Sequence, residues 1–426
     1  MISNKHSNTI RIAIIGGGAA GMMAAITATE NHAKVTLFEK NDRVGKKILA
    51  TGNGKCNLSN LDFSVAQYYC KAPAKLQKIF EKFSVQDTIQ FFQEKGLMIR
   101  DKNQYLYPYS EQASAVQDTL RKYLNQVEVI TDAEIVQIDH RNDKQNFEVK
   151  DQAGCCYYYD KVILACGSPA SLKKGEGMTG YKLAAQAGHQ INKLMPGLVS
   201  LQSNDSFIKA LAGVRSQAHI SLWINSQKVA EEQGELQFTD YGISGIPVFQ
   251  ISRLVSEAIH QDKNAKMRVN IDFFPEISNE AYQEFVKKRF NNLQEDNLEQ
   301  FLSGTVNKKI NIVMMKQVDL KPNKLVKEIG LKSILSLMQL YKNFVINITG
   351  PNTLDKAQIC AGGVDFAQVT ESMESTIRSG LYFAGEIVDI DGKCGGYNLQ
   401  WAWSSGYIAG KSASEINGTG KARTIC

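Results

Sequence analysis

The alternation of hydrophobic and polar positions changes its style along the chain. Residues 10 to about 190 alternate short apolar runs, typical of buried parallel strands, with segments of helical spacing. Short strand patterns follow from about 197 to 275, interrupted by the helical stretch PVFQISRLVSEAIH. Helical spacing dominates from 278 to about 342, and the α/β style returns after the strand-like FVINIT at 344–349.

These styles predict three domains, the first of which is discontinuous. Residues 1–192 and 357–426 would form an α/β domain. Residues 193–275 and 343–356 would form a β-rich inserted domain, and residues 276–342 a helical, lysine-rich inserted domain. A length of 426 residues is sufficient for two or three domains.

Composition excludes several classes of protein. Hydrophobic residues make up 43% and charged residues 22%, as in ordinary globular chains. The first ten residues lack the apolar core of a signal peptide, and glycines interrupt the apolar stretch 12–26, so no membrane span is expected there. Eight cysteines without an export signal indicate reduced thiols in the cytoplasm. Six scattered histidines and no C-x-x-C argue against a structural metal site.

The first chemical motif is IRIAIIGGGAAGMMAAITATE. A buried strand ends at Ile15, and Gly16, Gly18 and Gly21 then fit G-x-G-x-x-G before an Ala-rich helix. Such glycines permit a tight turn, backbone approach to a pyrophosphate and close packing of the helix. The next strand, KVTLFEK, ends in Glu39, whose carboxylate can accept both hydroxyls of an adenosine ribose. The order strand, glycines, helix, strand and acid predicts a dinucleotide site.

The segment NDRVGKKILATGNGKCNLSN favours FAD over NAD. Its Gly45, Gly52 and Gly54 alternate with residues that hydrogen-bond readily, so it can fold along an extended cofactor. A polar surface loop with solvated lysines is the alternative. A second glycine pattern, GEGMTG at 175–180, is not directly on a strand end, and we interpret it as a loop that enters a helix. NAD(P)H would therefore be a transient electron donor without a domain of its own.

A third motif lies near the C-terminus. The strand pattern in SGLYFAGEIVDIDG ends in Gly385 and Glu386, whose carboxylate can bind ribityl hydroxyls. In the following DGKCGGYNLQWAWSSG, Gly395 and Gly396 would let the backbone pass against the flavin edge. A helix that starts near Asn398 would stabilise negative charge on the reduced ring. Two tryptophans, at 401 and 403, are interpreted as core residues.

The motifs IIGGGAAG, GKKILATGNGKCNLSN, FTDYGISGIPVFQIS and GLYFAGEIVDIDGKCGGYNLQWAWSSGYIAG resemble those of one flavoprotein family over residues 10 to 411. This is the aminoacetone oxidase type, also called BaiN-like. The resemblance implies a doubly wound Rossmann-type FAD domain, interrupted by a β-barrel-like domain and a small helical domain. It also implies hydride transfer through flavin N5, with members linked to amine oxidation, to reduction of steroid-like enones and to formation of dihydrouridine in ribosomal RNA.

The predicted cofactor-binding residues come from these motifs and from the strand ends beside them. They are Gly16, Gly18, Ala19, Ala20, Gly21, Glu39, Lys40, Gly45, Lys46, Lys47, Thr51, Gly52, Asn53, Gly54, Cys56, Asn57, Ile135, Ala165, Cys166, Gly167, Gly385, Glu386, Gly395, Gly396, Tyr397, Asn398 and Leu399.

Charge favours RNA among the possible substrates. Residues 305–345 contain eight lysines and two acids, a net charge of +6 that equals that of the whole chain. Such a concentration is the footprint of a polyanion partner, although a solvated helical face is the alternative. Lys308, Lys309, Lys316 and Lys324 are the predicted RNA contacts. Reduction of a ribosomal uridine is therefore the first hypothesis. A small-molecule amine oxidase or enone reductase is the second, and a non-catalytic flavin-binding module is the third.

A proton donor near the flavin is not determined by the sequence. Cys56, Cys394 and Tyr397 are the candidate catalytic residues, because all three lie in motifs that approach the ring. Tyr241 and Ser244 of the inserted segment are further candidates. The two thiols can equally be small, buried and inert.

Overall fold

The computed structural model describes residues 9–140 and 147–415. The chain divides into two compact units, Met1–Leu194 with Cys360–Cys426, and Met195–Ile359. The first unit is thus built from two separated stretches of the chain. Whether the second unit separates further into β-rich and helical domains stays a prediction.

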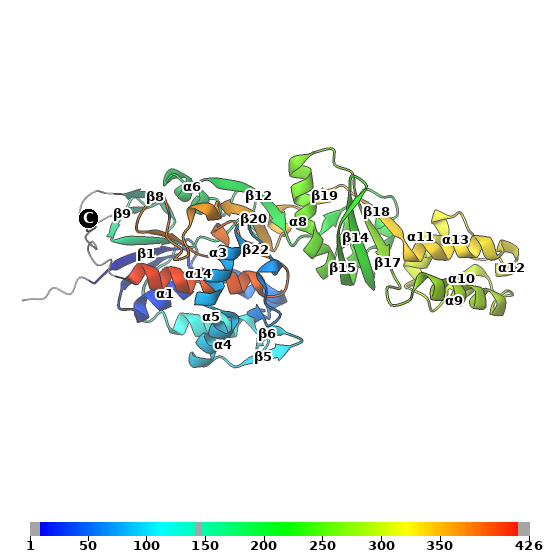
Figure 1. Ribbon diagram of the computed structural model, residues 1–426, viewed down its shortest axis with the longest axis horizontal. Coiled ribbons are helices and arrows are strands. Elements are labelled where there is room, and N and C mark those ends of the chain that lie inside the picture. Colours follow the sequence, from blue (N-terminus) through cyan, green and yellow to red (C-terminus); the bar gives the residue numbers. More distant parts are fainter. Residues whose placement is uncertain (1–8, 141–146, 416–426) are drawn as a thin grey trace, which may run out of the picture. The chain divides into compact units, whose positions relative to one another are not determined.

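A parallel sheet of five strands lies in the first unit, in the order β21-β11-β1-β2-β7. Its strand β1 is labelled in Figure 1. These strands are β1 (Arg11–Ile15), β2 (Lys34–Phe38), β7 (Glu128–Ile130), β11 (Lys161–Leu164) and β21 (Leu381–Phe383). The apolar runs of β1 and β11 are buried, as expected for strands covered on both faces. The predicted α/β class with a parallel sheet is confirmed. Strand β21 shows that the last part of the chain completes the sheet.

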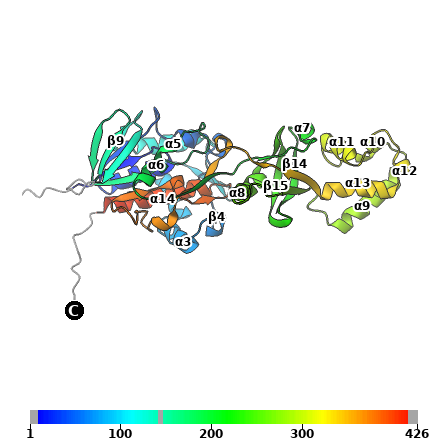
Figure 2. The same ribbon diagram turned by 90° about the horizontal axis from the view of Figure 1, so that it is seen from above.

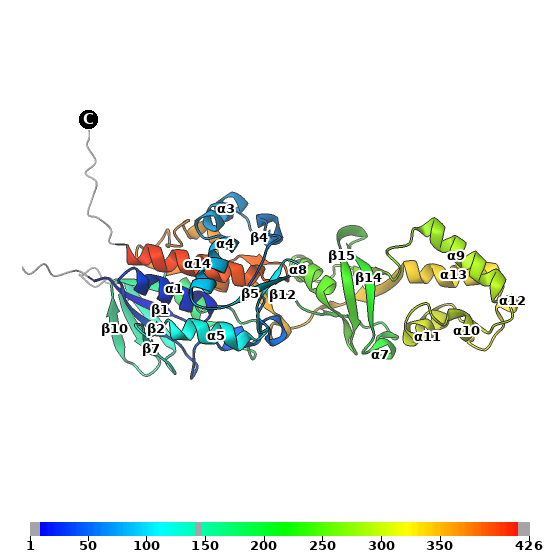
Figure 3. The same cartoon turned by 90° about the horizontal axis from the view of Figure 1, so that it is seen from below.

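Two helices with small residues at their contact pack side by side (Figure 3). These are α1 (Ala19–Glu30) and α14 (Tyr397–Ser414). A Cβ atom on Gly406 would lie 2.5 Å from the Ala20 carbonyl oxygen, and one on Gly410 would lie 2.4 Å from that of Ala24. Only glycine therefore permits this approach. Trp401 and Trp403 of α14 are 1% and 0% exposed, so their interpretation as core residues is confirmed.

Smaller elements surround this sheet. One is an antiparallel sheet in the order β10-β9-β8, of which β9 is labelled in Figure 2. The rings of Phe38 and Tyr157 lie 5.0 Å apart. Two further sheets have the orders β3-β6-β5 and β22-β4. Their elements and the remaining helices are β3 (Ser59–Asn60), β4 (Tyr68–Tyr69), β5 (Ile99–Lys102), β6 (Tyr105–Pro108), β8 (Ile135–His140), β9 (Phe147–Asp151), β10 (Cys156–Tyr159), β22 (Asp391–Gly392), α2 (Lys46–Leu49), α3 (Pro73–Lys82), α4 (Val85–Glu94), α5 (Ala113–Lys122) and α6 (Thr179–Gln186).

The chain passes from the first unit to the second in β12 (Ile191–Gly197) and returns in β20 (Ile359–Val364). Between them lies an antiparallel sheet of seven strands, in the order β18-β17-β14-β15-β16-β13-β19. The resemblance implied a barrel-like insertion, and β18 and β19 stand at the two ends of this sheet. The strands are β13 (Leu201–Gln202), β14 (Arg215–Ile224), β15 (Gln227–Phe238), β16 (Gly242–Ser244), β17 (Met267–Asp272), β18 (Phe344–Ile348) and β19 (Gly350–Pro351).

Helices complete the second unit and share its core. Tyr282, Met314 and Tyr341 of the helices belong to one buried cluster with Val269 and Ile346 of the strands. The helices are α7 (Ile208–Leu211), α8 (Ile246–Gln261), α9 (Asn279–Asn292), α10 (Leu298–Leu302), α11 (Lys308–Gln317), α12 (Val326–Ile329) and α13 (Leu331–Lys342). Helix α8 coincides with the helical stretch predicted between the strand patterns.

No helix in the described ranges has both the length and the apolar character needed to cross a bilayer. In the same ranges, no three His, Cys, Asp or Glu side chains gather as ligands of a metal ion would. The first eight residues, which carry most of the argument about a signal peptide, lie outside the described part.

Candidate cofactor site and active site

The glycines of the first motif lie at the carboxyl end of β1 and have different surroundings. A Cβ atom on Gly16 would lie 2.5 Å from the Ala165 carbonyl oxygen, and one on Gly21 would lie 1.9 Å from that of Gly16. Beside Gly18, by contrast, no described atom outside its own neighbouring backbone lies within 4 Å of such a Cβ atom. Two of the glycines are therefore required by the packing of the chain, and the third borders open space.

Glu39 fixes this loop from the end of β2. One carboxylate oxygen accepts the Gly17 N–H at 2.8 Å, and the other accepts the Asn41 N–H at 2.8 Å. The residue is only 8% exposed. The carboxylate is thus held beside the glycine loop, as the sequence led us to expect. That it also binds a ribose stays a prediction.

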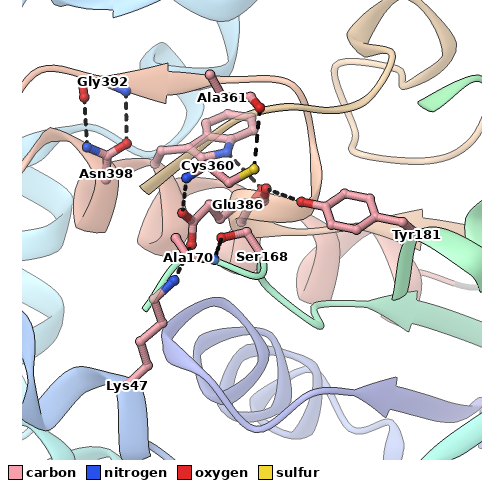
Figure 4. Close-up of polar contacts among 11 residues, drawn as sticks. Lys47, Ser168, Ala170, Tyr181, Cys360, Ala361, Glu386, Gly392 and Asn398 are labelled. Atoms are coloured by element: carbon pink, nitrogen blue, oxygen red, sulfur yellow. Dashed lines mark hydrogen bonds and ion pairs between the residues drawn. The ribbon is translucent and has the colours of Figure 1, made fainter. Parts of the chain in front are cut away.

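A second acid, the half-buried Glu386, connects three segments of the first unit (Figure 4). Its carboxylate accepts hydrogen bonds from the Lys47 ammonium at 2.8 Å and from the Cys360 N–H at 3.1 Å. Its carbonyl oxygen accepts the Tyr181 hydroxyl at 3.4 Å. Lys47 and Glu386 were both predicted and are brought together. Cys360 and Tyr181 were missed, because no motif of the sequence links them to this acid.

The loop after α2 makes a tight turn that only some residue types tolerate. Gly52, Asn53, Gly54 and Cys56 all have positive φ, between 53° and 82°. The side-chain oxygen Oδ1 of Asn57 is buried and has no hydrogen-bond partner within the described part of the chain. Because leaving a buried polar atom without a partner costs roughly 1–3 kcal/mol, this oxygen points to a ligand that donates a hydrogen bond.

The two glycines before α14 pack closely against other parts of the chain. A Cβ atom on Gly396 would lie 2.6 Å from the backbone of Ser59, and one on Gly395 would lie 2.9 Å from the ring of Tyr105. Their φ values are +98° and +129°. What approaches the chain so closely here is therefore its own β3 and β6. A role of this turn at the flavin edge stays a prediction.

Helix α14 begins without a side-chain cap. Its N-cap is Gly396, which offers no capping oxygen. Asn398 instead turns its amide away to the Gly392 backbone, donating to the carbonyl oxygen and accepting the N–H, both at 2.8 Å (Figure 4). Helix α1 likewise lacks a side-chain cap at Gly18. Uncapped first turns leave N–H groups and partial positive charge for an anionic or electron-rich group.

The three candidate proton donors are Cys56, Cys394 and Tyr397, and burial raises the pKa of each. Burial raises the pKa of Cys56 to about 12 and also raises the pKa of Cys394. Burial is likewise the largest cause that raises the pKa of Tyr397 to about 12, and its hydroxyl already donates to the Asp62 carbonyl oxygen at 2.8 Å. Both thiols are therefore neutral at physiological pH. The assignment of any of the three as catalytic stays a prediction.

Further predicted residues lie near these loops and contact other parts of the protein. Ala165, Cys166 and Gly167 follow β11, and the Cys166 thiol lies 3.3 Å from the Ile15 carbonyl oxygen. Burial raises the pKa of that thiol to about 12. Ile135 begins β8 and is buried, and the predicted loop at 175–180 does lead into α6. Lys46 pairs with Asp42 at the protein surface.

In the second unit, charge is more balanced than the lysine count suggested. Lys308 pairs with Glu299 at 2.7 Å, and Lys309 donates to the Ala212 carbonyl oxygen at 2.8 Å. Lys316 and Lys324 are exposed. Over residues 276–342 there are 11 basic and 8 acidic residues, a net charge of +3. Acids of α9 and α10, namely Glu280, Glu284 and Glu299, lie outside residues 305–345 and offset part of their positive charge.

Three observations on the first unit together fit an extended dinucleotide such as FAD. Gly18 borders open space at the uncapped start of α1, where a pyrophosphate would accept N–H groups. Glu39 lies beside this glycine loop, and Asn57 has a buried side-chain oxygen without a partner among the described residues. The residues present therefore match the group that the motifs predict.

Comparison with known proteins identifies the family. The HI0933-like protein Rossmann domain matches residues 10–412. The chain belongs to the HI0933-like family. One relative, the 3-dehydro-bile acid delta(4,6)-reductase of Clostridium scindens, is 37% identical over 95% of this chain and 99% of its own length. The ribosomal RNA dihydrouridine synthase of Haemophilus influenzae is 27% identical over 94% of this chain and 98% of its own.

A solved structure confirms the fold of this HI0933-like protein. The 3-ketosteroid delta1-dehydrogenase of Sterolibacterium denitrificans aligns with 96% of this chain and 100% of its own, with 11% identity and a TM-score of 0.50. At that identity only the fold is comparable. Its family, together with residues that fit a bound FAD, shows that this chain is an FAD-dependent oxidoreductase. The resemblance stated from the motifs is confirmed.

Proposed function

We propose that this HI0933-like protein is an FAD-dependent reductase of small α,β-unsaturated ketones, with NAD(P)H as the electron donor. The observation that carries the proposal is the 37% identity, over nearly the full length of both chains, to a reductase named for a conjugated 3-oxo bile acid. Full coverage matters because both units of this chain then have counterparts in that relative. The proposal places the small-molecule hypothesis ahead of the RNA hypothesis.

Bound FAD supplies hydride transfer at its N5 atom, and the chain supplies binding, orientation and charge. In the proposed enzyme, Gly18 and the first turn of α1 receive the pyrophosphate, and Glu39 holds the ribose. The Lys47–Glu386 pair holds loop 45–57 against the start of β20 through the Cys360 N–H. The uncapped start of α14 offers N–H groups to the end of the ring that becomes negative on reduction.

A second candidate, reduction of a ribosomal uridine, has its own support. Two relatives, 27% and 26% identical, are named ribosomal RNA dihydrouridine synthases. Their substrate shares its chemistry with an enone, because the C5–C6 double bond of uracil is also conjugated to a carbonyl group. The lysines that suggested RNA are, however, partly engaged within the protein. We therefore rank this function second.

One competition experiment separates the two. Purified FAD-containing protein is reduced anaerobically with NADH or NADPH and then mixed with a 3-oxo-Δ4,6 bile acid or with a uridine-containing ribosomal RNA fragment. We expect rapid reoxidation by the enone, with loss of its conjugated absorbance, and slow reoxidation by the RNA. Fast reoxidation by RNA with dihydrouridine in the nuclease digest, and none by the enone, would reverse the ranking.

A further inference from the structure

A small cavity in the first unit lies beside the loops assigned to the cofactor. It has a volume of about 180 Å³ and is lined by Lys55, Lys102, Asn103, Tyr105, Tyr107 and Glu111. Two of these residues, Tyr105 and Tyr107, occupy alternate positions on β6, so their rings lie on the same side of the strand. Leu106 between them is buried on the other side.

Both phenols adjoin the cofactor loops directly. A Cβ atom on Gly395 would lie 2.9 Å from the ring of Tyr105. One on Gly52 would lie 3.9 Å from the ring of Tyr107 and 3.0 Å from the Asn57 nitrogen. The cavity thus borders the turn before α14 and the loop with the unpaired Asn57 oxygen.

Charge around the cavity favours a negative group. Lys55 pairs with Glu111 at 2.8 Å, Lys102 approaches the same carboxylate at 3.6 Å, and Arg100 contacts it as well. One carboxylate therefore faces three cations. Burial is the main cause that raises the pKa of Tyr107, and the nearby Lys55 opposes it, so the phenol keeps its proton at neutral pH and can donate a hydrogen bond.

We propose that this cavity binds the carbonyl end of the substrate, with Tyr107 donating a hydrogen bond to the carbonyl oxygen and Tyr105 supporting it. This inference rests on the proposed function. When a hydride equivalent from the reduced cofactor adds to the β-carbon, the electron pair of the C=C bond moves onto the carbonyl oxygen. The enolate so formed is stabilised by the phenol and by the surplus positive charge. A proton from solvent then adds to the α-carbon and restores the carbonyl group.

Removal of the hydroxyl groups tests the proposal. Tyr107→Phe should lower kcat/KM for the 3-oxo-Δ4,6 bile acid by about 100-fold, the loss typical of one oxyanion donor. It should weaken binding of the saturated 3-oxo product, titrated through the flavin absorbance, by about 5-fold. Tyr105→Phe should lower kcat/KM by a smaller factor. Tyr109→Phe is the matched control, because this tyrosine follows β6 and is 59% exposed.

The outcomes keep the two proposals apart. If the parent reduces the enone and both phenylalanine variants stay within 2-fold of its kcat/KM, the cavity assignment is wrong and the function stands. If the parent reduces no enone but binds the saturated ketone, and Tyr107→Phe weakens that binding, the cavity assignment stands and the function is wrong. Absence of ketone binding to the parent overturns the cavity assignment. FAD content and the thermal midpoint confirm that each variant is folded.

Discussion

A valine in place of Gly18 tests the cofactor site at the scale of a single residue. Among the described residues, no atom outside the neighbouring backbone lies within 4 Å of a Cβ atom at this position, and φ of −81° is open to any residue. The variant should therefore fold normally. Its side chain would project into the space assigned to the pyrophosphate, so we expect the purified protein to lose more than nine-tenths of its FAD absorbance.

The control for this variant lies three residues further on. Gly21→Val would place a Cβ atom 1.9 Å from the Gly16 carbonyl oxygen, so we expect this protein to be unfolded or insoluble. Circular dichroism and the yield of folded protein distinguish the two effects. A Gly18→Val protein that retains full FAD occupancy would show that the site is misplaced.

Sequence reasoning found the residues of the glycine loop but not the reason for the later glycines. The order of strand, glycines, helix and acid is local, so Gly16, Gly21 and Glu39 could be placed from their spacing alone. Gly396 is glycine because Ser59 lies against it, more than 330 positions away in the chain. Such an approach depends on tertiary packing, which no local pattern records. Tyr107 escaped notice for the same reason.

At the scale of elements, a buried histidine joins the end of α6 to the segment before β21. His189 is 4% exposed, and its Nδ1 lies 3.2 Å from the Ala184 carbonyl oxygen. Nδ1 therefore donates, and Nε2 accepts the Ser375 hydroxyl at 2.7 Å. Burial lowers the pKa of His189 below 6.5, an effect that the nearby Arg378 charge reinforces and the Ala184 bond opposes.

This junction should make stability depend on pH. Because the unfolded chain binds a proton near pH 6.5 and the folded chain resists it, the contribution is intact above that pH and decreases as pH falls below it. We expect the thermal midpoint to decrease as the pH is lowered from 7.5 to 5.5. In the His189→Asn variant this pH dependence should be smaller. His32→Asn is the matched control, since this exposed histidine has a φ of 64°, which asparagine tolerates. Equal pH dependence in both variants would contradict the assignment.

The elements themselves were more predictable than their partners. Apolar runs and helical spacing placed β1, α1, β2, α8 and α14, because periodicity reflects which face is buried. Pairing is a different matter. The sequence did not reveal that α14 would lie on α1, because the glycines and alanines at that contact are small rather than hydrophobic.

At the scale of the whole molecule, the lysines of the second unit test the substrate class. We expect the variant with Lys308, Lys309, Lys316 and Lys324 all changed to Glu to reduce the enone within 2-fold of the parent, because those residues lie in a different unit from the cofactor site. Since two of the four lysines are already engaged, the slope of log affinity for single-stranded RNA against log salt should fall by only about 1.4.

Two results would restore the RNA hypothesis. One is loss of uridine reduction in the quadruple variant together with unchanged flavin content. The other is a change in salt slope near 2.8, the value for four released counterions on a single strand. A variant with Lys287 and Lys288 of α9 changed to Glu gives the effect of charge alone in the same unit.

The division of the first unit into two stretches also constrains how the protein is made. Residues 195–359 are contiguous and can fold as soon as they leave the ribosome. The sheet of the first unit must wait for β21, and α1 must wait for α14. At roughly 5–20 residues per second, the interval between β11 and β21 lasts on the order of 10–45 s. Throughout that time the nascent chain presents an unpaired strand edge and an uncovered alanine-rich helix, both suitable targets for a molecular chaperone.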